Sequence, residues 1–271
     1  MYKLIALDMD GTLLNEDKKI SKANLEAIRF ARKKGIKIVL ATGRPTKGIE
    51  KYLKELDLIH DNEYVVSYNG ALVQEVKSGR VIAQNTMSYD DLMFLFDISK
   101  KLNVNIHALT LTSCVTPKIN DYSILEATMN HIPLEVVDFN CLDKNTTIVK
   151  VMFVDPEKKL NAVISQLPES LYEKYTVVRS APFFLEFLNK KVNKGVGVEL
   201  LAKKLGIKKE EIICVGDAEN DIHMIKYAGL GVAMGNAFPE VKKIADYITK
   251  TNQEDGVAHV IKKFIMNKET A

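Results

Sequence analysis

The chain has 271 residues, of which 46% are hydrophobic and 27% charged, a balance typical of a soluble globular protein with a sizeable core. Its 38 basic and 35 acidic residues leave a net charge of +3, which argues against nucleic acid or an anionic membrane surface as a partner. No apolar run approaches the roughly 18 residues that cross a bilayer, so we expect no membrane association. Three widely spaced cysteines form no CxxC pair, which favours reduced thiols and a cytoplasmic location. Nothing in the sequence indicates the oligomeric state.

Several short apolar runs share one design, in which a stretch rich in Val and Ile ends abruptly on polar residues or glycine. Runs of this length without alternation predict strands that are buried on both faces of a parallel sheet. They cover residues 4–7, 37–41, 64–68, 212–215 and 230–234, with a weaker sixth at 247–249.

Helical patterns lie between these runs. Ser21 can cap a helix that Gly35 ends, residues 195–205 form an amphipathic pattern that ends at Gly206, and residues 221–228 form another. Alternating strands and helices predict an α/β fold with a doubly wound, Rossmann-like parallel sheet. In such sheets ligands bind beyond the carboxyl ends of the strands, where the polar residues that follow the apolar runs would gather.

The alternation lapses between about residues 82 and 188. Helical patterns at 89–102, 123–131 and 157–167 mix there with strand-like runs at 103–109, 148–154, 176–179 and 183–188. We predict an inserted α+β cap domain at 82–188, and a Rossmann-like core formed by 1–81 and 189–271.

The polar residues at the predicted sheet edge suit one kind of chemistry. Four carboxylates beside one lysine would repel one another without a cation, and hard oxygen ligands select Mg²⁺ or Ca²⁺. A hydroxyl group, a lysine and helix N-termini beside a metal form an anion site, and the combination indicates phosphoryl transfer. The residues are Asp8, Asp10, Thr42, Lys194, Asp217, Asn220 and Asp221.

Four segments of the chain resemble the motifs of the haloacid dehalogenase superfamily: "DMDGTLL", "TGR", "NKG" before an amphipathic helix, and "GDAENDIHM". The inserted α+β unit is similar to the larger cap of the Cof-type phosphatases in that superfamily. The first and fourth motifs are highly specific together, whereas "TGR" or "NKG" alone would be weak.

The resemblance implies roles for the four aspartates. Asp8 would be the nucleophile that accepts the phosphoryl group, and Asp10 would protonate the leaving group and later deprotonate water. Mg²⁺ would be held by Asp8, by Asp217 and by the backbone carbonyl of Asp10. Asp221 would orient the waters of the metal or the side chain of Lys194.

The resemblance also implies a set of phosphate-binding groups. The hydroxyl of Thr42 and the amides of Met9 and Gly43 would contact the transferring phosphoryl oxygens, with Asn220 as a further hydrogen-bond partner. Lys194 would place its charge on both the phosphate and Asp8.

Simpler interpretations exist for several of these residues. Asp8 and Asp10 could form a turn with an Asx cap before Gly11, although that does not explain Lys194 or "GDAEND". We expect Arg44 to form a structural ion pair rather than to touch substrate. Asn69 and Gly70 form a turn, and whether it faces the cap is an even choice.

The sequence thus favours a Mg²⁺-dependent phosphatase, a phosphoric monoester hydrolase that acts on a small phosphorylated metabolite such as a sugar phosphate. The predicted cap would enclose the site and exclude macromolecular substrates. A phosphomutase would use the same aspartyl phosphate. A receiver-like phosphoacceptor module for signalling also combines acidic residues, a hydroxyl and a lysine, but it needs no general acid at Asp10. Carbon–halogen cleavage needs neither Asp10 nor a metal, so the sequence favours this reaction least.

Overall fold

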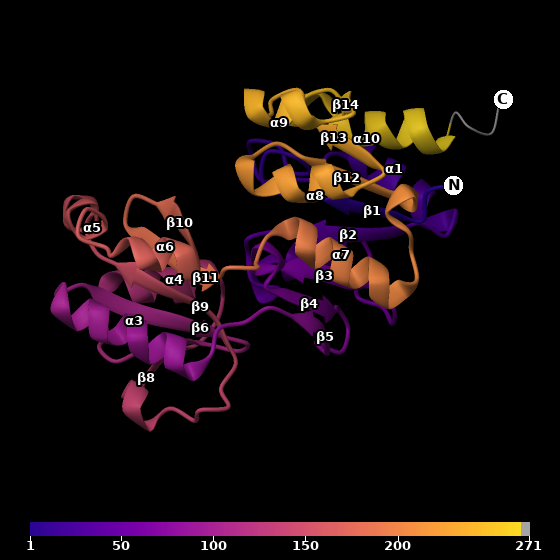
Figure 1. Cartoon of the computed structure of the whole chain (residues 1–271). Coiled ribbons are helices and arrows are strands. Elements are labelled where there is room, and N and C mark those ends of the chain that lie inside the picture. The colour runs from indigo at the N-terminus through magenta and orange to yellow at the C-terminus, as the bar shows by residue number, and fades with distance from the viewer. Residues whose placement is uncertain (267–271) are drawn as a thin grey trace. The chain divides into compact units, whose positions relative to one another are not determined.

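The computed structural model describes residues 1–266 of the chain, which divide into two compact units (Figure 1). The first unit comprises Met1–Gln84 together with the chain from Asn193 onward, and the second comprises Asn85–Val192. These divisions lie a few residues beyond positions 81 and 188, which the sequence indicates as boundaries. Among the described residues, no helix is both long and apolar enough to cross a membrane.

The first unit is built on a sheet with the strand order β14-β13-β12-β1-β2-β3-β4-β5 among the described residues. Neighbouring strands from β14 through β3 run parallel, as predicted, whereas β4 and β5 are antiparallel additions that the sequence analysis missed. The strands are β1 (Leu4–Leu7), β2 (Lys37–Ala41), β3 (Tyr64–Ser67), β4 (Leu72–Glu75), β5 (Val81–Gln84), β12 (Ile212–Gly216), β13 (Leu230–Ala233) and β14 (Tyr247–Ile248).

Helices cover both faces of this sheet, which confirms the doubly wound architecture. Helix α1 packs on α10, and α7 packs on α8. Ser21 caps α1 by accepting a hydrogen bond from the Asn24 amide, and Gly206 ends α7 in the left-handed conformation, as their positions predict. The helices are α1 (Lys22–Lys33), α2 (Glu50–Glu55), α7 (Lys194–Leu205), α8 (Ile222–Tyr227), α9 (Pro239–Ile244) and α10 (Gly256–Ile261).

The register of the central strands brings three chain segments to one edge of the sheet. Leu7 pairs with both Leu40 and Val215, so β1, β2 and β12 end at nearly the same level. Asp8, Thr42 and Asp217 follow those three strand ends directly. The edge predicted from the sequence is therefore present, with the polar residues where a parallel sheet binds ligands.

The second unit is an α+β fold on a sheet with the order β10-β11-β9-β6-β7-β8. Neighbouring strands are antiparallel except for the pair β7 and β8. Its strands are β6 (Asn105–Thr110), β7 (Cys114–Thr116), β8 (Leu134–Val136), β9 (Ile148–Val154), β10 (Tyr175–Ala181) and β11 (Phe184–Asn189). Its helices are α3 (Tyr89–Lys101), α4 (Asp121–Met129), α5 (Glu157–Ile164) and α6 (Glu169–Lys174).

Strand β9 explains how this second sheet is covered on both faces. Val151 and Phe153 pack with α3, α5 and α6, whereas the alternate residues Met152 and Val154 pack with side chains of α4. This strand, which the sequence analysis identified with the same bounds and which is apolar except for Lys150, therefore separates two apolar clusters.

His107 is a buried polar group beneath α4. Its ring is fully buried, with Nδ1 2.9 Å from the Ser123 hydroxyl and Nε2 3.2 Å from the Met152 sulfur. Burial, helped by the charge of Lys150, lowers the pKa of His107 to about 3. The ring is therefore neutral in the folded unit at neutral pH.

We predict that His107 makes the second unit sensitive to acid. In the unfolded chain the ring has its ordinary pKa near 6.5. Below that pH the ring is therefore protonated in the unfolded state but stays neutral in the folded state. The contribution of His107 to the free energy of unfolding is therefore fully present above about pH 6.5. As the pH drops further, this free energy falls by about 1.4 kcal/mol per pH unit. The measurement is hydrogen exchange of peptides from β6 and β9, corrected for intrinsic rates, in the native protein and in His107→Gln. The native protein should lose stability more steeply than the variant; parallel pH profiles would contradict the prediction.

Candidate active site

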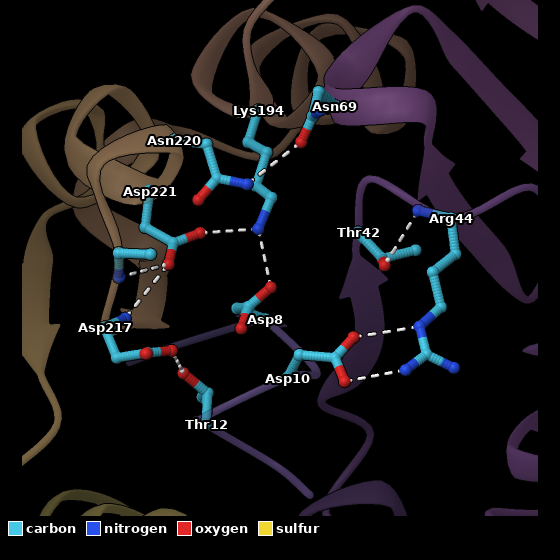
Figure 2. A network of polar contacts seen from close by, with 11 residues as sticks. Asp8, Asp10, Thr12, Thr42, Arg44, Asn69, Lys194, Asp217, Asn220 and Asp221 are labelled. Atoms are coloured by element: carbon cyan, nitrogen blue, oxygen red, sulfur yellow. Dashed lines mark hydrogen bonds and ion pairs between the residues drawn. The ribbon is translucent and has the colours of Figure 1, made fainter. Parts of the chain in front are cut away.

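Lys194 lies at the centre of a buried ionic cluster at the sheet edge (Figure 2). Asn193 caps α7 by accepting a hydrogen bond from the Val196 amide, so Lys194 is the first residue of that helix. The side chain is 1% exposed, and its Nζ lies 2.6 Å from Asp8 Oδ1 and 2.6 Å from Asp221 Oδ1. Burial alone lowers the pKa of Lys194, but the two carboxylates outweigh it and hold the pKa above its usual value. Lys194 is therefore a permanent cation.

Asp8, directly after β1, is buried and only partly neutralised. Burial raises the pKa of its carboxyl well above the ordinary range, the charge of Lys194 opposes that rise, and Asp221 and Asp217 add to it. A further positive charge beside Asp8 would favour the ionised form that a nucleophile requires.

Asp217 enters the same cluster after β12. Its Oδ1 accepts a hydrogen bond of 2.8 Å from the Thr12 hydroxyl. A Cβ at Gly11, where φ is +87°, would lie 2.3 Å from Asp217 Oδ2, so only glycine allows the loop after β1 to approach this closely. Burial raises the pKa of Asp217, and the Thr12 hydrogen bond counteracts this effect in part.

Asp221 holds the cluster together through both carboxylate oxygens. Oδ1 contacts Lys194, and Oδ2 accepts hydrogen bonds of 3.0 Å from the amides of Asp217 and Ala218. Asp8, Asp217 and Asp221 each offer an oxygen within 4.8 Å of the others, a spacing that could hold a metal ion. Since the oxygens of Asp221 already have protein donors, Asp8 and Asp217 are the better direct ligands.

Asp10 lies near Asp8 in the chain, but its side chain contacts different partners (Figure 2). Arg44 binds it through two nitrogens, Nε at 2.8 Å and Nη2 at 2.6 Å, and Lys18 Nζ lies 2.8 Å away. Burial raises the pKa of Asp10, but the hydrogen bonds from Arg44 and Lys18 outweigh it and bring the pKa below its ordinary value. The expected ion pair of Arg44 is thus present, and its partner is the predicted proton carrier.

At the sheet edge, the Thr42 hydroxyl and the amides of Met9 and Gly43 have no hydrogen-bond acceptor among residues 1–266. Thr42 is 2% exposed, and its Oγ1 accepts a hydrogen bond from the Arg44 amide, which leaves the hydroxyl proton for another partner. Within residues 1–266, nothing accepts a hydrogen bond from the amides of Met9 or Gly43. Donors in such a cluster suit an anion with several oxygens.

Asn220 is exposed, and its Nδ2 donates a hydrogen bond of 3.0 Å to Asn69 Oδ1 (Figure 2). The sequence analysis regarded Asn69 as part of a turn, and it assigned no role to Thr12 or Lys18. Thr12 could have been found as part of "DMDGT", and Asn69 as a polar residue directly after a strand. Lys18 carried no comparable signal.

Comparisons with known proteins agree with this geometry. The family model for haloacid dehalogenase-like hydrolases matches residues 5–261. The Bacillus subtilis protein YxeH, named as a candidate phosphatase, is 44% identical, covering 99% of this chain and 100% of its own. The 5-amino-6-(5-phospho-D-ribitylamino)uracil phosphatase YcsE of Bacillus subtilis is 32% identical, covering 97% of this chain and 96% of its own.

A solved structure of a haloacid dehalogenase-like hydrolase from Bacteroides thetaiotaomicron shares the fold. It superposes with a TM-score of 0.86 at 37% identity, covering 98% of this chain and 100% of that one. With the matched family model and these relatives, the chain belongs to the haloacid dehalogenase-like hydrolases and is a phosphatase of their Cof type.

Proposed function

We propose that the protein is a Mg²⁺-dependent phosphatase that hydrolyses small phosphate monoesters, such as sugar phosphates, through an aspartyl phosphate on Asp8. The observation that carries this proposal is the pairing of Asp8 with the buried Lys194 at 2.6 Å, beside donors that have no acceptor in the described part of the chain. Lys194 fixes the orientation of the carboxylate and offers its charge to an incoming phosphoryl group. The amides of Met9 and Gly43 and the Thr42 hydroxyl then bind phosphoryl oxygens, with Asn220 as a further donor.

The residues present fit a divalent cation. The Asp8, Asp217 and Asp221 carboxylates lie close together with one lysine among them, which leaves negative charge in excess. Asp8 and Asp217 would hold the ion together with the Asp10 carbonyl, to which no residue within 1–266 donates a hydrogen bond. Bound Mg²⁺ would supply positive charge for Asp8 and for the phosphoryl oxygens. Asp221 would act on the arrangement through Lys194 and the loop amides.

Asp10 is the proton carrier of the proposal. Its contacts with Arg44 and Lys18 keep it ionised in the described conformation, the form that activates water for the second step. For the first step Asp10 takes up a proton, which requires it to leave Arg44. The same carboxyl would then serve as the acid for the leaving group and as the base for water.

The groups described so far account for the reaction but not for the choice of leaving group. The proposed phosphate-binding groups all lie in the first unit and would contact only the phosphoryl group. They therefore do not discriminate between leaving groups. We assign the choice of leaving group to the Asn85–Val192 unit. The relative YcsE is named for a substrate with a phosphorylated ribityl group, which supports a small polyol or sugar phosphate as the substrate here.

The proposal is tested by phosphate release from a panel of phosphorylated sugars, nucleotides and cofactors. We expect turnover with Mg²⁺, little with Ca²⁺ and none in chelator, because Ca²⁺ is larger and takes more ligands. Asp8→Asn, which has no ionised oxygen to attack phosphorus, should be inactive on every compound. Full turnover in chelator would refute the metal assignment. Formation of an isomer instead of free phosphate would indicate a mutase.

We predict that Asp10→Asn discriminates between leaving groups. A basic alkoxide needs a proton to leave, so the rate of enzyme phosphorylation by an alkyl phosphate should fall roughly 10²–10⁴-fold. A nitrophenolate leaves without protonation, so transfer of the phosphoryl group from a nitrophenyl phosphate to the enzyme should slow far less. The measurement is the single-turnover rate of alcohol or phenol release from each substrate, with the exposed neighbour Asp17→Asn as a matched control. Equal losses for both substrates would remove Asp10 from the acid role.

A further inference from the structure

The turn after β3 has an unusual backbone. Tyr68, Asn69 and Gly70 adopt positive φ angles of 50°, 56° and 95° in succession. Glycine accepts this conformation and asparagine tolerates it, but a buried tyrosine adopts it only with backbone strain. Such a turn persists only when the residues around it hold it in place.

The backbone of the turn is hydrogen-bonded to the loop after β2, which carries Thr42. The Asn69 amide donates to the Thr42 carbonyl at 2.9 Å, and the Tyr68 amide donates to the Arg44 carbonyl at 3.2 Å. A Cβ at Gly43 would lie 3.2 Å from the Asn69 carboxamide, so this side chain packs directly against the phosphate-binding amide segment.

Gly70 brings the same turn against the start of α7. A Cβ on Gly70 would lie 2.1 Å from the Asn193 carbonyl oxygen and 3.3 Å from the Lys194 Cα. The carbonyl belongs to the residue that caps α7, and Lys194 follows it. A larger residue at position 70 would therefore displace the lysine that pairs with Asp8.

The Asn69 side chain completes a third contact, to the loop after β12. Its Oδ1 accepts the hydrogen bond from Asn220 Nδ2 at 3.0 Å (Figure 2). One short turn thus contacts the three chain segments that carry Thr42, Lys194 and Asn220. These segments are far apart in the chain, and each supplies a group of the proposed phosphoryl site.

We propose that Asn69 is a positioning residue that fixes the orientation of the Asn220 carboxamide at the phosphoryl site, an inference that rests on the function proposed above. The amide nitrogen of Asn220 has two protons, and Asn69 accepts one of them, which leaves the other for a phosphoryl oxygen. Without Asn69 the exposed Asn220 side chain is free to rotate and to present its carbonyl oxygen, which repels the anion. The left-handed backbone is what directs the Asn69 side chain between Gly43 and Asn220.

The test uses Asn69→Gly, because glycine keeps the left-handed backbone and removes only the carboxamide. Asn62→Gly is the matched control, since Asn62 is an exposed asparagine with φ 63° in the same unit. We expect Asn69→Gly to lower kcat/KM for an aryl phosphate roughly tenfold, the usual size for one lost hydrogen bond. Affinity for orthovanadate with Mg²⁺ should fall by the same factor, with no change in the melting temperature beyond that of the control.

A double-mutant cycle separates positioning from general structural support. In an Asn220→Ala background, the additional change Asn69→Gly should have no further effect on kcat/KM or on orthovanadate affinity, because Asn69 acts through Asn220. A loss of the same size in both backgrounds, or native kinetics and vanadate affinity in Asn69→Gly, would overturn the inference while the proposed function stands. If the native protein neither turns over monoesters nor binds orthovanadate, the proposed function and this inference both fail.

Discussion

The contact of the Lys194 ammonium with Asp8 and Asp221 is the constraint on which the rest of the site depends. Three charged groups are buried together, and losing one partner of such a pair typically costs about 3–5 kcal/mol because the other charge is left without compensation. Through this contact the first residue of α7 is tied to the end of β1 and to the loop after β12, whose amides Asp221 also binds. The arrangement is therefore stable only when all three segments are in place, which is what a preorganised phosphoryl site requires.

The environments of Asp8 and Asp10 shift the pKa values of two identical carboxyl groups in opposite directions. Burial beside other carboxylates raises the pKa of Asp8, which a bound cation can reverse, whereas Arg44 and Lys18 lower the pKa of Asp10. Two carboxyl groups whose pKa values are shifted in opposite directions commonly take distinct roles in one reaction. The proposed division, with attack by Asp8 and proton transfer by Asp10, uses the difference, and it makes release of Asp10 from Arg44 a necessary event in each catalytic cycle.

Sequence reasoning reached the parallel core, the inserted unit and the group of Asp8, Asp217, Asp221 and Lys194, because short buried runs followed by polar residues have one favoured arrangement. It missed β4 and β5, since β4 follows β3 directly through a left-handed turn, β5 pairs back on β4, and both strands are too short to leave a clear periodic signal. It could not find the contacts of Asp10 with Lys18 or of Asn69 with Asn220. Those contacts depend on side-chain directions that only the packed structure fixes.

The most direct measurement is to locate the phosphoryl group on the protein during turnover. Asp10→Asn should be phosphorylated by an aryl phosphate with Mg²⁺ and then stall, because no base activates water. Acid quenching and mass spectrometry of peptides should find one added phosphoryl group on Asp8, and none in the double variant Asp8→Asn/Asp10→Asn. A phosphoryl group on another residue, or continued phosphate release by the double variant, would contradict the assignment of Asp8 as the nucleophile.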